Sequence, residues 1–232
     1  MEILQEAFKI IVSMDKEFLE IIFVTLTMAT ISTIISSFLG ITIGLILVKK
    51  SRLEKPSRFM RWFLKLNSMM MAFPPVVCGL FVFLLLSRNG PLGEYRLLFS
   101  IPAMVFAQVI LITPVVISLT YDVARSVFKQ MNETLIGLHL SKKEEFILLI
   151  KELKNELISI ICVAFSRSLA EVGAVNMVGG NIQYKTRVLT TAIMLETSKG
   201  NFDKAIAMGL VLLTLAFVIQ ISIGKVLGKK YD

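Results

Sequence analysis

The sequence has only one histidine, two cysteines and one tryptophan, so side chains that commonly build metal sites and catalytic centres are scarce. The cysteines, Cys78 and Cys162, lie inside apolar runs and lack the spacing of metal ligands or of a disulfide framework. We therefore expect them to be small buried side chains, and we expect neither a metal site nor a cofactor. Of the functions considered, a membrane-embedded enzyme is the least favoured.

Proline is also infrequent, with six residues and none after Pro114, and long polar stretches are few. Hydrophobic residues make up 55% of the chain, compared with about 45 to 50% in soluble domains, which indicates burial in a lipid bilayer. The formal net charge of +8 would suggest nucleic acid in a soluble protein. Here the basic residues lie between apolar runs, so they are interpreted as topology signals and no nucleic-acid partner is expected.

Five apolar stretches are long enough to cross the hydrocarbon core, for which a helix needs about 20 residues. They are Ile21–Val48, Leu66–Ser87, Leu97–Tyr121, Leu157–Val178 and Ala205–Gly224. We therefore predict an all-α integral membrane fold with about five transmembrane helices, formed by one domain over residues 1–232. Pro74, Pro75 and Pro114 are expected to kink the second and third spans.

Lysine and arginine are distributed unequally between the two sides that five spans define. Segments 49–65 and 125–154 and the tail after Gly224 hold sixteen of these residues, and the segments of the other side hold eight. The positive-inside rule therefore places the N-terminus outside and the C-terminus in the cytoplasm, in a cell (plasma or inner) membrane. The first residues lack the cationic region of a cleaved signal peptide, so we expect the spans themselves to direct insertion.

Two short amphipathic segments are expected on the outer side. Residues 1–17 carry apolar side chains at helical spacing, which predicts either a helix on the outer membrane face or an extension of the first span. Val188–Leu195 is the second segment, and we expect a re-entrant or surface helix there.

The longest polar segment, residues 122–156, is expected to form a cytoplasmic loop of two short helices joined by a turn. A chain of 232 residues is long enough for one membrane bundle but too short for a bundle and a soluble ATPase domain. Energy coupling would therefore need a separate subunit that docks on such a loop. An ordinary solvated connector is the alternative, and the histidine is interpreted as an interface residue or a bystander. The candidate coupling residues are Glu133, Gly137, Leu138, His139 and Leu140.

Arg167 and Glu171 are charged residues inside the fourth apolar stretch. At a spacing of four they share one face of a helix and can form an ion pair, which lowers the cost of placing either charge in the membrane. Such a pair would serve either a gate or transport pathway, or a structural lock between neighbouring spans.

A group of small and polar residues follows this pair. Gly173, Gly179 and Gly180 permit close backbone approach, and together with Asn181 they could present N–H donors to an anion. The alternative is that these glycines only pack helices together. Hydroxyls of the first span could line a polar path, but such hydroxyls often bond the carbonyl four residues earlier. They are Thr25, Thr27, Thr30, Ser32, Thr33, Ser36 and Ser37.

The cytoplasmic loop resembles the coupling segment of binding-protein-dependent ABC transporter permeases. Gly137 matches the glycine of the EAA loop of that family. Two features differ from the family pattern, because Glu133 lies four residues before this glycine instead of six, and no Leu-Pro pair follows.

Stretches Phe73–Val77, Arg88–Gly93 and Ser166–Ile193 resemble the molybdate, sulfate and tungstate branch of these permeases, and Glu171–Asp203 is most similar to tungstate permeases. The resemblance implies the type I, MetI-like importer fold, a homodimer, two ABC ATPase subunits and an extracellular or periplasmic substrate-binding protein. It also implies an oxyanion substrate, tungstate first and molybdate or sulfate as alternatives, with ATP hydrolysis in the partner. The competing hypothesis, an ATPase-independent secondary transporter, predicts inverted repeats or unpaired intramembrane carboxylates.

Overall fold

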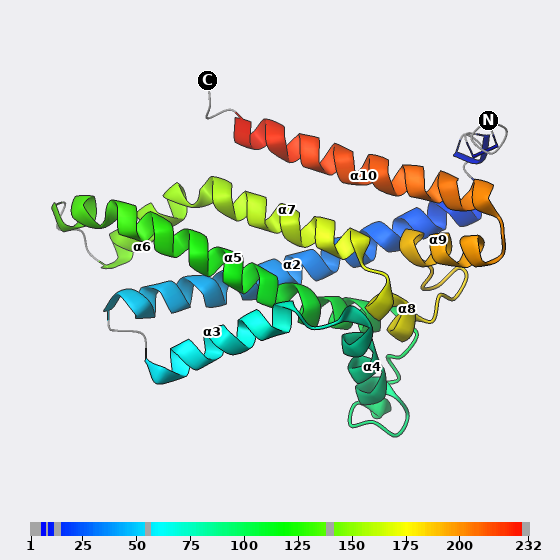
Figure 1. Cartoon of the computed structure of the whole chain (residues 1–232), viewed down its shortest axis with the longest axis horizontal. Coiled ribbons are helices and arrows are strands. Elements are labelled where there is room, and N and C mark those ends of the chain that lie inside the picture. Colours follow the sequence, from blue (N-terminus) through cyan, green and yellow to red (C-terminus); the bar gives the residue numbers. More distant parts are fainter. Residues whose placement is uncertain (1–5, 8, 12–14, 54–56, 138–141, 229–232) are drawn as a thin grey trace.

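A computed structural model describes residues 6–7, 9–11, 15–53, 57–137 and 142–228 of the chain (Figure 1). Every regular element in these ranges is a helix, which confirms the prediction of an all-α fold. The elements are α2 (Lys16–Leu53), α3 (Arg58–Met71), α4 (Pro75–Leu86), the 3-10 helix η1 (Gly93–Tyr95), α5 (Ile101–Gly137), α6 (Lys142–Glu152), α7 (Lys154–Ala170), α8 (Gly173–Gly179), α9 (Leu189–Ser198) and α10 (Phe202–Gly228).

Three helices, α2, α5 and α10, are each long and apolar enough to cross a membrane. The pairs α3–α4 and α7–α8 meet the same criterion only as bent pairs, so the described residues hold three to five spans. The 38 residues of α2 and the 37 of α5 correspond to about 55 Å of helix, against about 30 Å of hydrocarbon core. Both helices therefore extend beyond the lipid.

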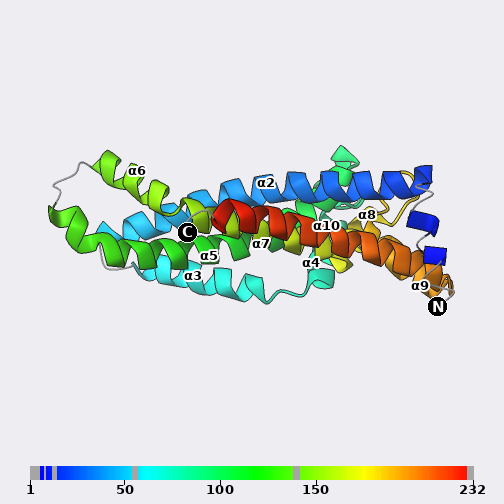
Figure 2. The same cartoon turned by 90° about the horizontal axis from the view of Figure 1, so that it is seen from above.

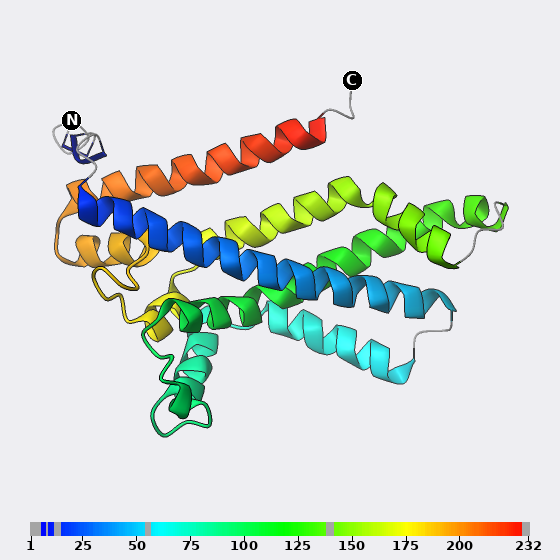
Figure 3. The ribbon, with the colours of Figure 1, turned by 180° about the vertical axis from the view of Figure 1, so that it is seen from behind.

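The long helices lie along one axis and define two ends of the bundle (Figure 2). The C-terminal ends of α2 and α5, together with α6, lie at one end, and the beginning of α2 lies with α9 at the other (Figure 3). The α2–α3 connection and the α5–α6 connection thus share one end. These are the two loops in which the sequence concentrates its basic residues.

The core of the bundle is the contact between α2 and α5. A Cβ at Gly40 would lie 2.6 Å from the Cβ of Val116, and one at Gly44 would lie 2.7 Å from the Cβ of Thr120. Small residues let helix backbones approach closely, and in lipid this packing is a main source of helix association. Helix α10 lies at the periphery instead, since only 17% of its apolar window is buried, compared with 67% for α5.

The expected second span, 66–87, is broken in the structure. Helix α3 ends at Met71, α4 begins at Pro75, and the two axes differ by 102°. Pro74 and Pro75 explain the break, because proline has no N–H to continue the helix and disfavours helical geometry in the residue before it. The predicted kink at these prolines is therefore confirmed, and the structure shows it as a full break between two helices.

The expected fourth span, 157–178, is also broken. Helix α7 ends at Ala170, and α8 begins at Gly173 with a bend of 58°. The second halves of the two broken spans then pack against each other. A Cβ at Gly79 of α4 would lie 2.8 Å from the Cα of Ala174, and one at Gly173 would lie 2.7 Å from Cγ2 of Val76.

The two amphipathic segments differ in how much of each the structure describes. Val188–Leu195 falls almost entirely within α9, which confirms a helix there, and its residues Leu189 and Ala192 are buried against Phe18 and Ile21 of α2. Most of the 1–17 segment lies outside the described residues. Its placement on the membrane face, like that of α9, stays a prediction.

Candidate functional site

Arg167 lies in the last turn of α7, and Glu171 lies in the break between α7 and α8. Glu171 has an extended backbone, with φ −73° and ψ 130°, so the two residues do not occupy successive turns of one helix. The Glu171 Oε1 atom accepts a hydrogen bond of 3.2 Å from the backbone N–H of Ala174 in α8. Within the described ranges the two side chains form no ion pair, and Nε of Arg167 is buried without a partner. The predicted pair is therefore wrong, because the helix ends between its members.

The end of α7 is stabilised by side chains from two other helices. The last carbonyls of an α-helix have no partner within the helix and need donors from elsewhere. Gln108 of α5 donates from Nε2 to the carbonyl of Ser168, at 2.9 Å, and Thr190 of α9 donates from Oγ1 to the carbonyl of Glu171, also at 2.9 Å. The break is thus a hydrogen-bonded joint.

A buried polar cluster accompanies this joint. The Ser32 Oγ and Ser168 Oγ atoms each lie 2.6 Å from Gln108 Oε1 and 2.8 Å from each other, and all three residues are fully buried. The cluster connects α2, α5 and α7. Our sequence analysis did not select Gln108, although a single amide within an apolar run is the kind of residue that marks an internal contact between membrane helices.

The hydroxyls of the first span divide into two groups. Thr25 and Ser32 donate to the carbonyl four residues earlier, at 2.6 and 2.8 Å, as the alternative interpretation expected. Thr33, Ser36 and Ser37 are buried, and their hydroxyls have no hydrogen-bond partner among the residues that the structure describes. Thr25 and Ser32 also bond Leu189 and the Gln108 cluster, whereas the hydrogen-bonding capacity of the other three hydroxyls is not used by the described residues.

The predicted glycine and asparagine positions lie together on α8 and the connection to α9. A Cβ at Gly179 would lie 2.8 Å from Sδ of Met104, and Gly180 has φ +70° with its N–H bonded to the Asn176 carbonyl at 2.9 Å. Gly179 therefore permits close packing, and Gly180 ends α8 in a left-handed conformation that favours glycine. The N–H of Gly180 is not available to an anion.

Asn181 is held by the chain itself. Its Oδ1 atom accepts a hydrogen bond of 3.0 Å from Thr191 Oγ1, and its Nδ2 atom donates to the Thr191 carbonyl at 3.4 Å. Thr186 nearby donates from Oγ1 to the Gly179 carbonyl at 2.6 Å. These bonds fix the 180–188 connection to α9, so the geometry assigns Asn181 to positioning that segment.

The connection also carries an ion pair to the start of α2. Arg187 Nη1 lies 2.9 Å from Glu17 Oε1, and the two side chains are 14% and 40% exposed.

In the turn between α9 and α10, Glu196 accepts hydrogen bonds from Asn201 at 2.8 Å and Lys199 at 2.9 Å. Burial raises the pKa of Glu196, but these two donors and the positive charge of Lys199 outweigh it, so the pKa is lowered overall.

The predicted coupling residues lie at the opposite end. Glu133 and Gly137 are in the last two turns of α5, whereas residues 138–140, with His139, lie outside the described residues. The base of this segment is well packed, because Tyr121, Leu149 and Leu153 form one buried cluster that connects α5 and α6 with the end of α2. The end of α5 and α6 therefore extend from a rigid base (Figure 1).

Known proteins resemble this chain along nearly its whole length. It is 37% identical to the tungstate uptake system permease protein TupB of Peptoclostridium acidaminophilum over 95% of this chain and 96% of that protein. It is 43% identical to TupB of Campylobacter jejuni over 65% of this chain and 63% of that protein. The sulfate transport system permease protein CysT of Escherichia coli is 28% identical over 86% and 73%.

Among solved structures, an inward-facing MetNI methionine ABC transporter matches with a TM-score of 0.67 at 13% identity, over 93% of this chain and 99% of that chain. At this identity the match establishes the fold alone, and it confirms the expected MetI-like architecture. Residues 36–229 match the family described as binding-protein-dependent transport system inner membrane component. With its apolar helices and this match, the chain is a multi-pass protein of the cell membrane that belongs to that family of transport permeases.

Proposed function

We propose that this chain is the membrane-spanning permease subunit of an ATP-driven importer for an oxyanion, specifically tungstate. The observation that carries the proposal is the 37% identity to a tungstate uptake permease over 95% of the chain. The identity to a sulfate permease is lower, at 28%, which ranks sulfate behind tungstate as a substrate, and molybdate is kept as an alternative. The chain itself would catalyse nothing, and ATP hydrolysis would take place in two partner ATPase subunits.

Coupling to those ATPases is assigned to the end of α5 and the α5–α6 connection, around Gly137. Helix α5 is about 55 Å long, so nearly half of it extends beyond a hydrocarbon core of about 30 Å. A long helix that runs from the buried cluster of Tyr121 to its end at Gly137 can transmit a push at that end to the membrane interior. With the C-terminus in the cytoplasm, this end faces the ATPases.

A homodimer would complete the pathway, which would run along its two-fold axis. The arm formed by α4 leaves the bundle steeply (Figure 1) and contains no charged residue, and much of its apolar surface is uncovered in the single chain. Non-helical backbone at membrane depth, as at residues 72–74, is tolerated where protein or a water-filled cavity covers it. A second copy would provide that cover. The exposed apolar residues of α4 are Val76, Val77, Leu80, Phe81, Leu84 and Leu85.

The test is ATPase activity and anion uptake in proteoliposomes that contain the permease, its ATPase and its binding protein. Tungstate, molybdate and sulfate are added in turn. Stimulation of ATP hydrolysis and uptake by tungstate-loaded binding protein supports the proposal. If only molybdate or only sulfate stimulates, that anion is the substrate instead of tungstate. Uptake without ATP would reject the ATP-driven mechanism.

The coupling assignment is tested in the same assay with Leu138→Asp and Leu140→Asp together. The double variant should lose the stimulation by loaded binding protein but still assemble in the membrane. Lys185→Asp also introduces an acidic residue at an exposed position, at the other end of the bundle, and should retain stimulation. Equal stimulation in both variants would contradict the assignment.

A further inference from the structure

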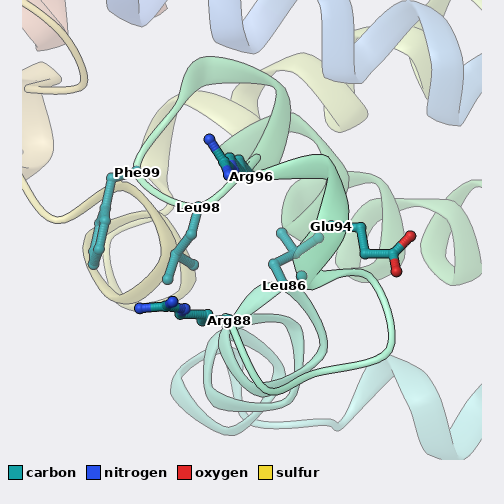
Figure 4. Close-up of a pocket in the computed structure, with 7 residues that line it drawn as sticks. Leu86, Arg88, Glu94, Arg96, Leu98 and Phe99 are labelled. Carbon is teal, nitrogen blue, oxygen red and sulfur yellow. The ribbon is translucent and has the colours of Figure 1, made fainter.

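A second polar feature lies in the 87–100 connection between α4 and α5, which includes the Arg88–Gly93 stretch of the family resemblance. Together with the end of α4 it forms an open cavity of about 790 Å³, whose lining includes Arg88, Glu94, Arg96 and Phe99. Figure 4 shows the two arginines on the walls of this cavity, with the carboxylate of Glu94 directed away from both guanidinium groups. The charge presented to the cavity is therefore positive.

The connection is held in a defined conformation. Its backbone forms hydrogen bonds from Leu92 N–H to the Leu85 carbonyl at 3.0 Å and from Phe99 N–H to the Val178 carbonyl at 3.0 Å. A Cβ at Gly90 would collide with the carbonyl oxygen of Leu84, so only glycine fits this turn. A fixed backbone lowers the entropy that a ligand must overcome to order its site.

Among the described residues, Arg88 and Arg96 have no acidic partner. Both side chains are exposed, and in the part of the chain that the structure describes neither forms an ion pair or donates a side-chain hydrogen bond. The guanidinium group presents several N–H donors in a planar fork, which matches the oxygens of a tetrahedral anion and forms strong charge-assisted hydrogen bonds. Arg88 and Arg96 are thus available to a ligand of that kind.

The position of the cavity also favours an anion in transit. The uncharged arm α4 carries the connection away from the bundle, and charged side chains are costly in lipid, so Arg88 and Arg96 require a water-filled space. In Figure 1 the segment that returns to α5 lies on the side of α4 opposite to α3, towards the end of the bundle that holds α9. That end is the predicted outer side.

From this cavity, its unpaired arginines and its position we infer a binding site of low affinity for a tetrahedral oxyanion at the outer mouth of the pathway. The site would take up the anion when the binding protein releases it. The inference rests on the proposed function as an oxyanion importer. Two copies of the chain would place two such sites around the same axis.

The site is tested by direct binding of tungstate to the permease–ATPase complex in lipid nanodiscs, without the binding protein, by equilibrium dialysis with elemental analysis of tungsten. Arg88→Gln with Arg96→Gln should weaken binding about tenfold or more, since each loses a charge-assisted hydrogen bond. Lys185→Gln removes one exposed cation near the same end and should bind as the unmodified complex does. Unchanged melting temperatures will show that the variants are folded.

Three outcomes would overturn the inference: no saturable binding by the unmodified complex, equal binding by the double variant, or loss of binding in the Lys185→Gln control as well. A phospholipid headgroup offers the same phosphate chemistry, so the dialysis is repeated in neutral nanodiscs and in nanodiscs with phosphatidylglycerol. Tungstate binding that persists with the anionic lipid supports the substrate site. Binding that disappears there identifies a headgroup site instead and rejects ours.

Uptake in proteoliposomes separates this inference from the proposed function. If the unmodified assembly does not take up any oxyanion, the proposed function fails. Suppose that the unmodified assembly transports tungstate and that the double variant transports it equally well at a low concentration of tungstate-loaded binding protein. The proposed function then stands and the arginine site fails. We expect tungstate uptake by the double variant to be reduced about tenfold at this low concentration, because its binding of tungstate is weakened by a similar factor.

Discussion

The two breaks in the predicted spans, α3–α4 and α7–α8, have different physical causes. At the α3–α4 break the prolines remove the helical hydrogen bonds, and the 102° bend leaves α4 with an uncovered apolar surface. At the α7–α8 break no proline is present, and donors from α5 and α9 bond the carbonyls of Ser168 and Glu171. The first break is local in origin and the second is tertiary.

The two breaks therefore differ in how much of their surroundings a single chain provides. At the α7–α8 joint the carbonyls of Ser168 and Glu171 are bonded within the chain and α8 is packed, whereas Nε of Arg167 is buried without a partner among the described residues. The α4 arm is complete only on the side that faces α8, where Gly79 lies against Ala174. The role of Arg167 and Glu171 in a gate or transport pathway stays a prediction.

The largest effect is expected where the two broken spans meet. Gly79→Ala places a Cβ 2.8 Å from the Cα of Ala174, and backbone cannot give way as a flexible side chain can. The free energy of unfolding should fall by about 1 to 3 kcal/mol, measured as a lower thermal midpoint in detergent. Gly209→Ala is the matched control, because its Cβ meets nothing within 4 Å, and it should not destabilise the protein. Equal midpoints for the two variants would contradict this packing.

The next effect concerns the α7–α8 joint. Ser168→Ala removes the hydroxyl that donates to Gln108 and should cost about 1 kcal/mol. Ser36→Ala also removes a fully buried hydroxyl from a membrane helix, but one that has no partner in the described residues, and it should be neutral. Urea or detergent unfolding that ranks Ser36→Ala as the more damaging would show that the cluster does not stabilise the joint.

A smaller effect is expected at the other broken span, on α3. Asn67 donates from Nδ2 to the Pro114 carbonyl at 2.9 Å and to Ser118 Oγ at 2.8 Å, which anchors α3 on α5. Asn67→Leu should destabilise by about 0.6 to 1 kcal/mol and speed hydrogen exchange in α3. Ser68→Ala removes only a bond within α3 and should leave the exchange unchanged. If Asn67→Leu also leaves exchange unchanged, the anchor is not significant.

The smallest effect is a pH dependence after the second broken span, in the α9–α10 turn. Because the pKa of Glu196 is lowered in the folded state, its contribution is fully present above the ordinary glutamate value of about 4.3 and is lost as pH falls through the lowered pKa. Glu196→Gln should flatten the decline of the thermal midpoint below about pH 4.3. Asp122→Asn, an exposed acidic residue elsewhere, should keep that decline, and identical curves for Glu196→Gln and the unmodified protein would contradict the prediction.

Much of the fold could be predicted from the sequence because membrane burial depends on long apolar runs. The stretches 21–48 and 205–224 fall within α2 and α10, and all but the first four residues of 97–121 fall within α5. The family resemblance agrees with the matches to transport permeases. The site was less predictable. Gly179 lies in close contact with Met104 and Gly180 ends α8 in a left-handed conformation, but their role in a gate or pathway stays a prediction. Gln108 was not selected, because a single amide gives no periodic pattern.

The sequence by itself determined which stretches enter the membrane and where the first break falls, since proline acts on its own backbone whatever surrounds it. Only the tertiary structure decided the second break. Residues 166–174 are compatible with a continuous helix, and an ion pair of Arg167 with Glu171 would follow from it. Gln108 and Thr190, distant in the chain, instead satisfy the carbonyls at the end of α7, so the helix can end there at little cost.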